Sequence, residues 1–289
     1  MTGDGTRAAG PWPAASTRAL GVLGWPVAHS LSPVMHNAAL AHDGLDLTYL
    51  ALPVPPDRLP EVVPALGAVG FRGANVTVPH KQAVMAACSV LTEEARLVGA
   101  VNTLTWDDGV LEGHNTDAVG LERALDEVGA GRGPAVLLGT GGAARAAVVA
   151  LARRGAEVTV VGRRPDAARE LADLGAGLDG AVVHALALDG AGVADAVASA
   201  DLVVNATPLG MDREALPTPF MSLTRGQTAY DLVYAPPDTP FLQDAAAAGA
   251  GAHHGLSMLV HQAAVAYERW TARPAPTSVM RAAAETALG

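Results

Sequence analysis

Apolar residues in the first part of the chain, up to about residue 116, form short runs that alternate with stretches of helical character. The runs are residues 20–24, 47–54 and 71–76, and the helix-like stretches are 33–41, 59–69 and 80–87. Strands that alternate with helices are typical of βαβ units, whose strands form a mostly parallel sheet. We therefore predict an α/β domain here.

A second, more regular alternation begins near residue 118 and continues to about 245. The expected strands are 134–138, 157–161, 202–205 and 228–233, with Ala-rich helical stretches such as 143–154 and 166–174. Residues 135–138 are apolar without polar alternation, as in parallel strands covered on both faces. The chain from 256 to 288 is predicted to be helical, and 129–134 is the predicted joint between the halves.

Composition narrows the class of protein. Of the 289 residues, 50% are hydrophobic and 17% are charged, which excludes disorder along the whole chain. The net charge of −10 argues against a nucleic-acid binder or an anionic membrane surface. No apolar stretch approaches the length of a membrane span, and a single cysteine, Cys88, excludes an internal disulfide framework. We expect a soluble, cytoplasmic protein whose residues 1–18 form a flexible tail.

A glycine-rich loop follows the expected strand 134–138 and opens the next helix. Gly139, Gly141 and Ala144 occupy the three small-residue positions of the G-x-G-x-x-[G/A] fingerprint. In that fingerprint the glycines permit a tight turn and a close backbone approach, and the helix N-terminus faces a pyrophosphate. An ordinary Gly-rich turn could have the same sequence pattern, but the strand before it and the helix after it favour a dinucleotide site.

The end of the next strand indicates which dinucleotide is bound. NAD sites place an acidic residue there, whereas NADP sites place an arginine that receives the 2′-phosphate. This chain has Arg163 and Arg164, with no carboxylate before Asp166. Solvated surface arginines are the alternative, and we favour NADP.

Polar clusters in the first half lie where strands or turns lead into helices, and they suggest a small, anionic, hydroxyl-rich substrate. Serine hydroxyls can bind a carboxylate, and Thr77 and Asn102 can bind ring hydroxyls. Lys81 and Asp117 together can form a proton-transfer pair beside a carbonyl or an alcohol. Taken singly, each residue also fits a structural role, for example Ser32 as a helix cap.

Eight ordered motifs resemble those of the shikimate dehydrogenase family, from about residue 20 to the C-terminus. They are residues 24–33 with 35–37, 73–81, 99–103, 115–120, the glycine-rich loop, 205–211, 231–236 and 255–263. The resemblance implies that the protein interconverts 3-dehydroshikimate and shikimate by hydride transfer with NADP(H), in aromatic amino-acid biosynthesis.

The resemblance also implies roles for individual residues. Lys81 and Asp117 would be the catalytic pair. The substrate contacts would be Ser30 and Ser32 at the carboxylate, and Thr77, Asn102 and Gln262 at the ring hydroxyls, with Asp117 and Tyr234 beside them. The cofactor contacts would be Gly139, Thr140, Gly141, Gly142 and Ala143 at the phosphates, Arg163 and Arg164 at the 2′-phosphate, and Met211 and Gly255 toward the nicotinamide, with Thr207 as a further contact.

The family fold implies a Rossmann-like NADP-binding domain plus an α/β substrate-binding domain, with the C-terminal helices returning to the first domain. The expected bounds are 19–117 for the substrate-binding and catalytic domain, 118–245 for the NADP-binding domain and 246–289 for the C-terminal helices. The family's cofactor loop commonly reads Asn-Arg-Thr, and Gly162-Arg163-Arg164 keeps only the arginine. We expect a monomer or a homodimer.

Three other functions compete with this one. A quinate or dual quinate/shikimate dehydrogenase, often linked to NAD, would share the motifs, although Ser32 and Arg163 favour shikimate and NADP. A non-catalytic binding homologue is disfavoured because both Lys81 and Asp117 are present. A metal-dependent hydrolase is disfavoured because the chain has no H-E-x-x-H or H-x-x-E-H pattern, so we expect no metal.

Overall fold

The protein is described here by a computed structural model, which covers residues 13–289. The chain divides into two compact units. The first contains the described residues up to Thr116 together with Gln262–Ala287, and the second contains Asp117–His261. Residues 129–134, the predicted joint, lie inside the second unit, and the chain passes between units at 116/117 and 261/262.

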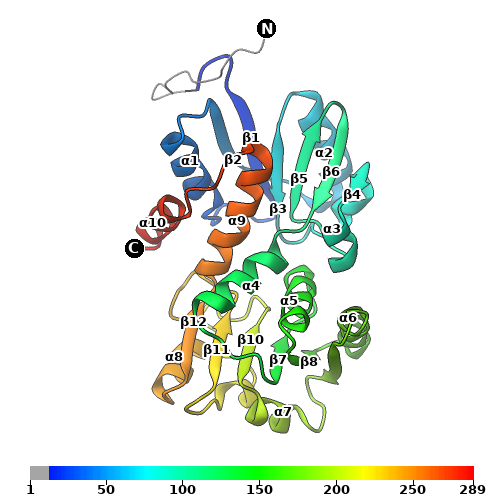
Figure 1. Ribbon diagram of the computed structural model, residues 1–289, viewed down its shortest axis with the longest axis vertical. Helices are drawn as coiled ribbons and strands as arrows, with labels where there is room; N and C mark the ends of the chain where they lie inside the picture. The colour runs from blue at the N-terminus through cyan, green and yellow to red at the C-terminus, as the bar shows by residue number, and fades with distance from the viewer. Residues whose placement is uncertain (1–12) are drawn as a thin grey trace. The chain divides into compact units, whose positions relative to one another are not determined.

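The first unit is built on a mixed six-stranded sheet with the order β2-β1-β3-β5-β6-β4 (Figure 1). Its strands are β1 (Arg18–Gly24), β2 (Leu47–Pro53), β3 (Gly73–Val76), β4 (Val90–Leu91), β5 (Thr103–Asp107) and β6 (Val110–His114). Strands β2, β1 and β3 are parallel, as predicted, and so are β4 and β6. Strand β5 is antiparallel to both β3 and β6, so the sheet is mostly parallel, as predicted, with one antiparallel strand that the alternation does not predict.

The β5–β6 hairpin explains the mixed sheet. Its two-residue turn is Asp108-Gly109, and both residues have positive φ angles, 44° and 80°. An Asp-Gly pair is the usual sequence for such a turn, because it tolerates the left-handed backbone that two-residue hairpins require. The sequence therefore contains a local signal for this hairpin, which the alternation of apolar runs and helical stretches does not reveal.

Helices α1 (Ser32–His42), α2 (Leu59–Ala68), α3 (Glu93–Val98) and α10 (Thr277–Leu288) complete the first unit. The helix expected over 80–87 is only a 3-10 turn, Ala83–Ala87. The carbonyl of Lys81 accepts a hydrogen bond from the Val101 amide at 2.8 Å, so it points toward the sheet instead of continuing a helix.

Before β1, Ser16 and Thr17 both donate to the Asp46 carboxylate. The rest of the tail, residues 1–12, lies outside the described residues.

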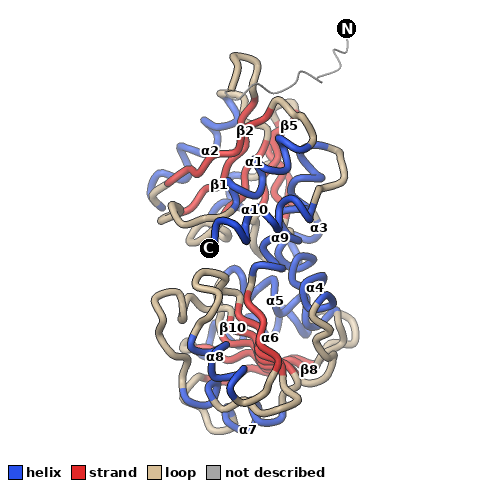
Figure 2. The backbone as a smooth tube through the Cα atoms, turned by 90° about the vertical axis from the view of Figure 1, so that its left-hand side faces the viewer, coloured by secondary structure: helices blue, strands red, loops and turns tan. Residues whose placement is uncertain are grey.

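The second unit contains an all-parallel sheet with the order β12-β11-β10-β7-β8-β9. Figure 2 draws its strands in red. These strands are β7 (Ala135–Leu138), β8 (Glu157–Gly162), β9 (Val182–Ala187), β10 (Leu202–Asn205), β11 (Thr228–Asp231) and β12 (Gly251–His254). In chain order within the unit this is 3-2-1-4-5-6, the Rossmann arrangement. The predicted Rossmann-like domain is therefore present.

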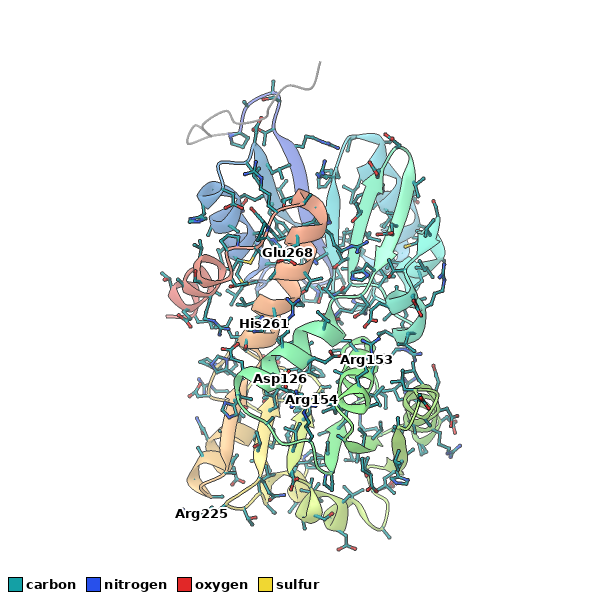
Figure 3. All side chains as sticks on the ribbon, in the orientation of Figure 1. Asp126, Arg153, Arg154, Arg225, His261 and Glu268 are labelled. Atoms are coloured by element: carbon teal, nitrogen blue, oxygen red, sulfur yellow. The ribbon has the colours of Figure 1, made fainter. Side chains whose placement is uncertain are left out.

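The helices of the second unit are α4 (Asp117–Glu127), α5 (Gly142–Arg153), α6 (Pro165–Ala176), α7 (Val193–Ser199) and α8 (Pro240–Ala247). Arg154, which follows α5, forms an ion pair with Asp126 on α4 and donates to the carbonyl of Ala130 at 2.8 Å (Figure 3). These contacts fasten residues 129–134 to α5, which is why this Gly-rich stretch is part of a packed unit. The predicted C-terminal helices are α9 (Leu256–Thr271) and α10, and α9 continues from the second unit into the first.

Candidate active site

The predicted substrate residues of the first unit gather at one edge of its sheet. Ser30 and Ser32 follow the carboxyl end of β1, and Thr77 follows the carboxyl end of β3. Asn102 precedes β5, which is antiparallel to β3, so its amino end lies at the same edge. The register pairs Leu23 with Val76, and Asn75 with Thr103. Topology alone therefore brings these polar residues to one end of the sheet.

Lys81 is held at this edge by the backbone around it. The Lys81 carbonyl accepts from the amide of Val101, the residue before Asn102. The ring of His80 is 1% exposed, and its Nε2 atom lies 2.7 Å from the carbonyl oxygen of Val54, to which it donates. Lys81 is also the only lysine among the 19 lysine and arginine residues of the chain.

Asn102 and Gln262 meet directly, as their shared predicted role requires. The Asn102 side chain is 2% exposed, and its Nδ2 lies 3.4 Å from Oε1 of Gln262. Thr116 contacts both: its amide donates to Asn102 Oδ1 at 2.8 Å, and its hydroxyl donates to Gln262 Oε1 at 3.4 Å. Thr116 was not among the predicted site residues, although it lies in the quoted motif 115–120. The next residue is Asp117, 4% exposed, which opens α4.

His114 borders this cluster through its backbone, since its carbonyl accepts from the Asn102 amide at 3.0 Å, and its ring contacts the Thr92 hydroxyl at 2.9 Å. Burial, and then the positive charge of Arg269, lower the pKa of His114 to about 4, against opposing effects of Glu94 and Glu112. Its ring is therefore neutral at physiological pH and does not titrate near neutrality.

The predicted phosphate-binding residues lie at the carboxyl end of β7 in the second unit. Gly139 has a φ of +126°, and an added Cβ would lie 3.0 Å from the backbone of Ala206, which follows β10. Since β7 is the strand at which the strand order reverses, this is the switch point where open α/β sheets bind ligands. Gly141 instead faces open space, with no protein atom within 4 Å of an added Cβ, at the N-terminus of α5. A tight turn beside an open helix N-terminus fits a bound pyrophosphate.

Two further glycines show how closely the backbone passes around this edge. An added Cβ on Gly162 would lie 2.6 Å from Thr140 Cγ2. At Gly255, which follows β12, it would lie 2.3 Å from the carbonyl oxygen of Leu232. Gly255 therefore requires glycine, because the obstacle is backbone, whereas at Gly162 the nearest group is the Thr140 side chain, which places the end of β8 against the glycine-rich loop.

Arg163 and Arg164 follow β8 and are exposed. Within residues 13–289 neither guanidinium forms an ion pair, so both charges can meet a ligand phosphate. No acidic residue takes the position that would bind a ribose 2′-hydroxyl. This arrangement fits NADP better than NAD.

Thr207 is oriented by a buried hydrogen-bond cluster at the ends of β10 and β11. Its amide and its hydroxyl both donate to Asn205 Oδ1, at 3.0 and 2.7 Å, and Asn205 Nδ2 donates to Asp231 Oδ1 at 2.9 Å. Burial raises the pKa of Asp231 to about 6, against hydrogen bonds from Thr239, Val233 and Asn205. Met211 is 41% exposed in the following loop, and Tyr234 follows β11 in the same unit.

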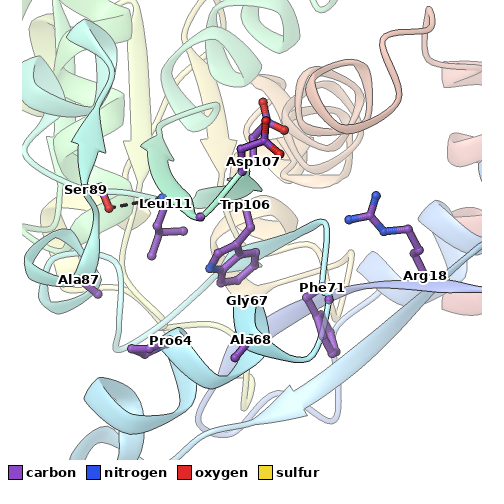
Figure 4. A pocket seen from close by; sticks show the side chains of 13 residues that line it. Arg18, Pro64, Gly67, Ala68, Phe71, Ala87, Ser89, Trp106, Asp107 and Leu111 are labelled. Atoms are coloured by element: carbon purple, nitrogen blue, oxygen red, sulfur yellow. Dashed lines mark hydrogen bonds between the residues drawn. The ribbon is translucent and has the colours of Figure 1, made fainter.

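A separate hollow in the surface of the first unit contains none of the predicted site residues (Figure 4). Trp106 and Phe71 line it, together with Arg18 and Asp107, and the Leu111 amide donates a hydrogen bond to Ser89 Oγ in its wall.

Among residues 13–289 there is no cluster of three or more His, Cys, Asp or Glu side chains able to hold a metal ion. In the same range, no helix combines the length and the apolar character needed to cross a membrane.

Comparison with known proteins agrees with this geometry. Residues 22–104 match the shikimate dehydrogenase substrate binding domain, and residues 255–285 match the shikimate 5'-dehydrogenase C-terminal domain. The NADP(+)-dependent shikimate dehydrogenase of Moorella thermoacetica is 46% identical over 95% of both chains. The chain belongs to the shikimate dehydrogenase family.

Solved structures of this family superpose closely on the protein. The shikimate 5-dehydrogenase of Thermus thermophilus, solved with NADP(H) and shikimate, is 39% identical with a TM-score of 0.85, covering 94% of this chain and 100% of that one. The quinate dehydrogenase of Corynebacterium glutamicum, solved with NAD, is 31% identical with the same TM-score, covering 93% and 99%. The fold is thus shared by members with different substrates and cofactors, so the side chains must determine which are used.

Proposed function

We propose that the protein is a cytoplasmic shikimate dehydrogenase that interconverts 3-dehydroshikimate and shikimate with NADP(H), within aromatic amino-acid biosynthesis. One observation supports this most strongly. The first unit collects hydroxyl, amide and ammonium groups at one sheet edge, and the second unit presents a dinucleotide loop followed by two exposed arginines. The high identity to curated NADP-dependent shikimate dehydrogenases supports the same reaction.

Gly139 to Ala143 would hold the cofactor phosphates, Arg163 and Arg164 the 2′-phosphate, and Met211 and Gly255 the nicotinamide end. Thr207 would be a further cofactor contact. When bound, the reduced cofactor supplies a hydride to the substrate carbonyl carbon, and the oxidised cofactor accepts one. The remaining chemistry falls to side chains of this protein.

In the reducing direction the carbonyl oxygen must gain a proton as its carbon is reduced. Lys81, as an ammonium ion, donates that proton and becomes a neutral amine. In the oxidising direction the neutral Lys81 amine accepts the proton of the shikimate hydroxyl as the hydride leaves. Asp117 orients Lys81 and the reacting hydroxyl, and its negative charge favours the protonated amine. Ser30 and Ser32 hold the carboxylate, while Thr77, Asn102 and Gln262, with Tyr234, hold the ring hydroxyls.

The assignment of Lys81 is tested by initial rates of shikimate oxidation. We expect Lys81→Ala to lower kcat by about 100- to 10,000-fold, the usual loss when a positioned acid–base group is removed. Gln82→Ala, which changes the exposed neighbouring residue, is the control and should leave the rate unchanged. Near-normal turnover of Lys81→Ala would overturn the assignment.

The single lysine permits a chemical test of the same point. An amine-selective acylating reagent can modify only Lys81 and the N-terminal amine, because the chain has no other lysine. Acylation should abolish turnover in step with the Lys81 adduct measured by mass spectrometry, and bound shikimate should slow both. Full activity in protein acylated at Lys81 would exclude a proton-transfer role.

Substrate and cofactor preference are settled by crossing shikimate and quinate with NADP and NAD in the same assay. Turnover only with shikimate and NADP is the expected result. Comparable rates with quinate, or a preference for NAD, would place the protein with dual-specificity or quinate enzymes. Absence of turnover with every pair would leave the non-catalytic homologue as the better explanation.

A further inference from the structure

A row of buried polar side chains crosses the first unit beneath the substrate edge of its sheet. Its members are Tyr49 on β2, Asn75 on β3, Asn102 and Thr103 at the start of β5, Thr116 after β6 and Gln262 on α9. Each is at most 7% exposed. Buried polar groups are costly unless they are hydrogen-bonded, so each member of the row depends on the direction of its neighbours' hydrogen bonds.

The first three bonds all have a fixed direction. The Asn75 Nδ2 atom lies 3.2 Å from the backbone carbonyl of Asn102, which can only accept, so the Asn75 amide has one orientation. Its oxygen therefore accepts the hydrogen bond from the Tyr49 hydroxyl, at 2.6 Å. Its nitrogen also donates to the Thr103 hydroxyl at 3.2 Å, and Thr103 in turn donates to Asn102 Oδ1 at 3.0 Å.

The direction continues on the other side of Asn102. The backbone amide of Thr116 can only donate, and it lies 2.8 Å from Asn102 Oδ1. This fixes Asn102 with its nitrogen toward Thr116 Oγ1, at 2.9 Å, and toward Gln262 Oε1. The Thr116 hydroxyl lies within hydrogen-bond distance of two accepting oxygens, Asn102 Oδ1 at 3.2 Å and Gln262 Oε1 at 3.4 Å. The side-chain donors from Tyr49 to Asn102 thus face toward Thr116 and Gln262.

Tyr49 is well suited to begin such a chain. Its ring stacks on His36, with centroids 4.3 Å apart and planes within 9°, and lies 6.1 Å from the Trp270 ring. Burial raises the pKa of Tyr49 well above its ordinary value, against smaller effects of Ser32 and Asn75 that lower it. The phenol is therefore protonated, and a donor, throughout the working pH range.

We propose that Tyr49 is a positioning residue for the ring-hydroxyl side of the substrate site. It donates the first hydrogen bond of the chain and holds the Asn75 amide, which in turn contacts the Asn102 backbone carbonyl and the Thr103 hydroxyl next to the Asn102 side chain. The inference rests on the proposed function, because it takes the Asn102 and Gln262 amides to be the contacts for the ring hydroxyls of shikimate.

The direct test removes the first donor. In Tyr49→Phe the oxygen of Asn75 loses this donor, so the buried amide that supports the Asn102 carbonyl and the Thr103 hydroxyl is no longer held from this end. We expect the KM for shikimate to rise about five- to tenfold, the effect of about one net hydrogen bond, with kcat and the KM for NADP within about twofold. Tyr267→Phe is the matched control. Tyr267 is also fully buried in the first unit, but it donates to Asp43, which is not part of the hydrogen-bond chain.

A second pair of variants separates hydrogen bonding from packing. Thr103→Ser keeps the hydroxyl and loses a methyl group, whereas Thr103→Val keeps the shape and loses the hydroxyl. A packing role predicts that the serine variant is the worse of the two, because it leaves a small cavity. The hydrogen-bond chain predicts the reverse, with a raised KM for shikimate in Thr103→Val and a value near that of the unchanged protein in Thr103→Ser.

The outcomes distinguish a wrong positioning role from a wrong proposed function. If the unchanged protein turns over shikimate and Tyr49→Phe matches Tyr267→Phe, the positioning role is wrong while the proposed function stands. An equal KM for shikimate in the two Thr103 variants, or a higher KM in Thr103→Ser, would also contradict the positioning role of the hydrogen-bond chain. This test holds even if Tyr49→Phe fails to fold. No turnover of shikimate by the unchanged protein would overturn both conclusions.

Discussion

Acid should destabilise the first unit through His36, and the effect can be calculated. His36 is fully buried, stacked on Tyr49 and 5.4 Å from the Trp270 ring. Burial lowers the pKa of His36 from 6.5 to about 3, with a small opposing effect of Asn75. Below pH 6.5 the unfolded chain therefore binds a proton at this residue that the folded protein does not bind until about pH 3.

The sign of the effect follows from this difference. Where the unfolded state binds more protons, stability rises with pH, so the contribution of His36 is complete above pH 6.5 and is lost as pH falls toward 3. The full loss is about 5 kcal/mol, since each pKa unit corresponds to about 1.4 kcal/mol. Between pH 7 and pH 5 the expected loss is about 2 kcal/mol.

His36→Phe tests this expectation because it keeps an aromatic ring in the stack and removes the titrating group. Urea unfolding would be measured at pH 7 and pH 5 for the unchanged protein, for His36→Phe and for His42→Phe. His42 is exposed at the end of the same helix and serves as the control. The decrease in the free energy of unfolding between the two pH values should be about 2 kcal/mol smaller in His36→Phe alone. An equal decrease in all three proteins would refute the reasoning that burial keeps His36 neutral.

Two further substitutions test the cofactor side. Arg163→Ala should raise the KM for NADP by about 10- to 100-fold and leave the KM for NAD unchanged. The control is Arg169→Ala, which removes an exposed arginine that pairs with Asp166. Equal effects of Arg163→Ala on both cofactors would contradict a 2′-phosphate contact. Gly255→Ala should lower the melting temperature and raise the KM for NADP, because its Cβ would lie 2.3 Å from the Leu232 carbonyl oxygen. Gly131→Ala, whose added Cβ has its nearest neighbour at 3.7 Å, should do neither.

The second unit was largely predictable because its signals are local. Strands β7, β8, β10 and β11 are apolar runs, and the glycine-rich loop follows the first of them directly. The two strands that were missed, β9 and β12, are the edge strands of the sheet. Each has solvent on one side, so β9 includes the exposed His184 and β12 reads Gly-Ala-His-His, with no β-branched residue. An edge strand needs less apolar surface, and its sequence is correspondingly less distinctive.

The residue types of the active site were also predictable, but their connections were not. Ser32, Thr77 and Asn102 stood out because each belongs to a polar cluster where a strand or a turn was expected to lead into a helix. Asn75 lies inside the expected strand 71–76 and was assigned no role, although a buried amide in a strand must find partners across the sheet. Which partners it finds depends on the neighbouring strand and on the register, and neither can be read from Asn75 itself.

The hairpin turn could have supplied part of that register. A two-residue turn at Asp108-Gly109 pairs Asp107 with Val110, and counting outward from it pairs Thr103 with His114. Asn102 must then lie beside the residues that follow His114, which is where the structure places Thr116. The contacts of Tyr49 and Gln262 come instead from segments distant in the chain, β2 and α9, and no local pattern specifies them. The middle of the hydrogen-bond chain thus follows from one turn, while its two ends required the tertiary structure.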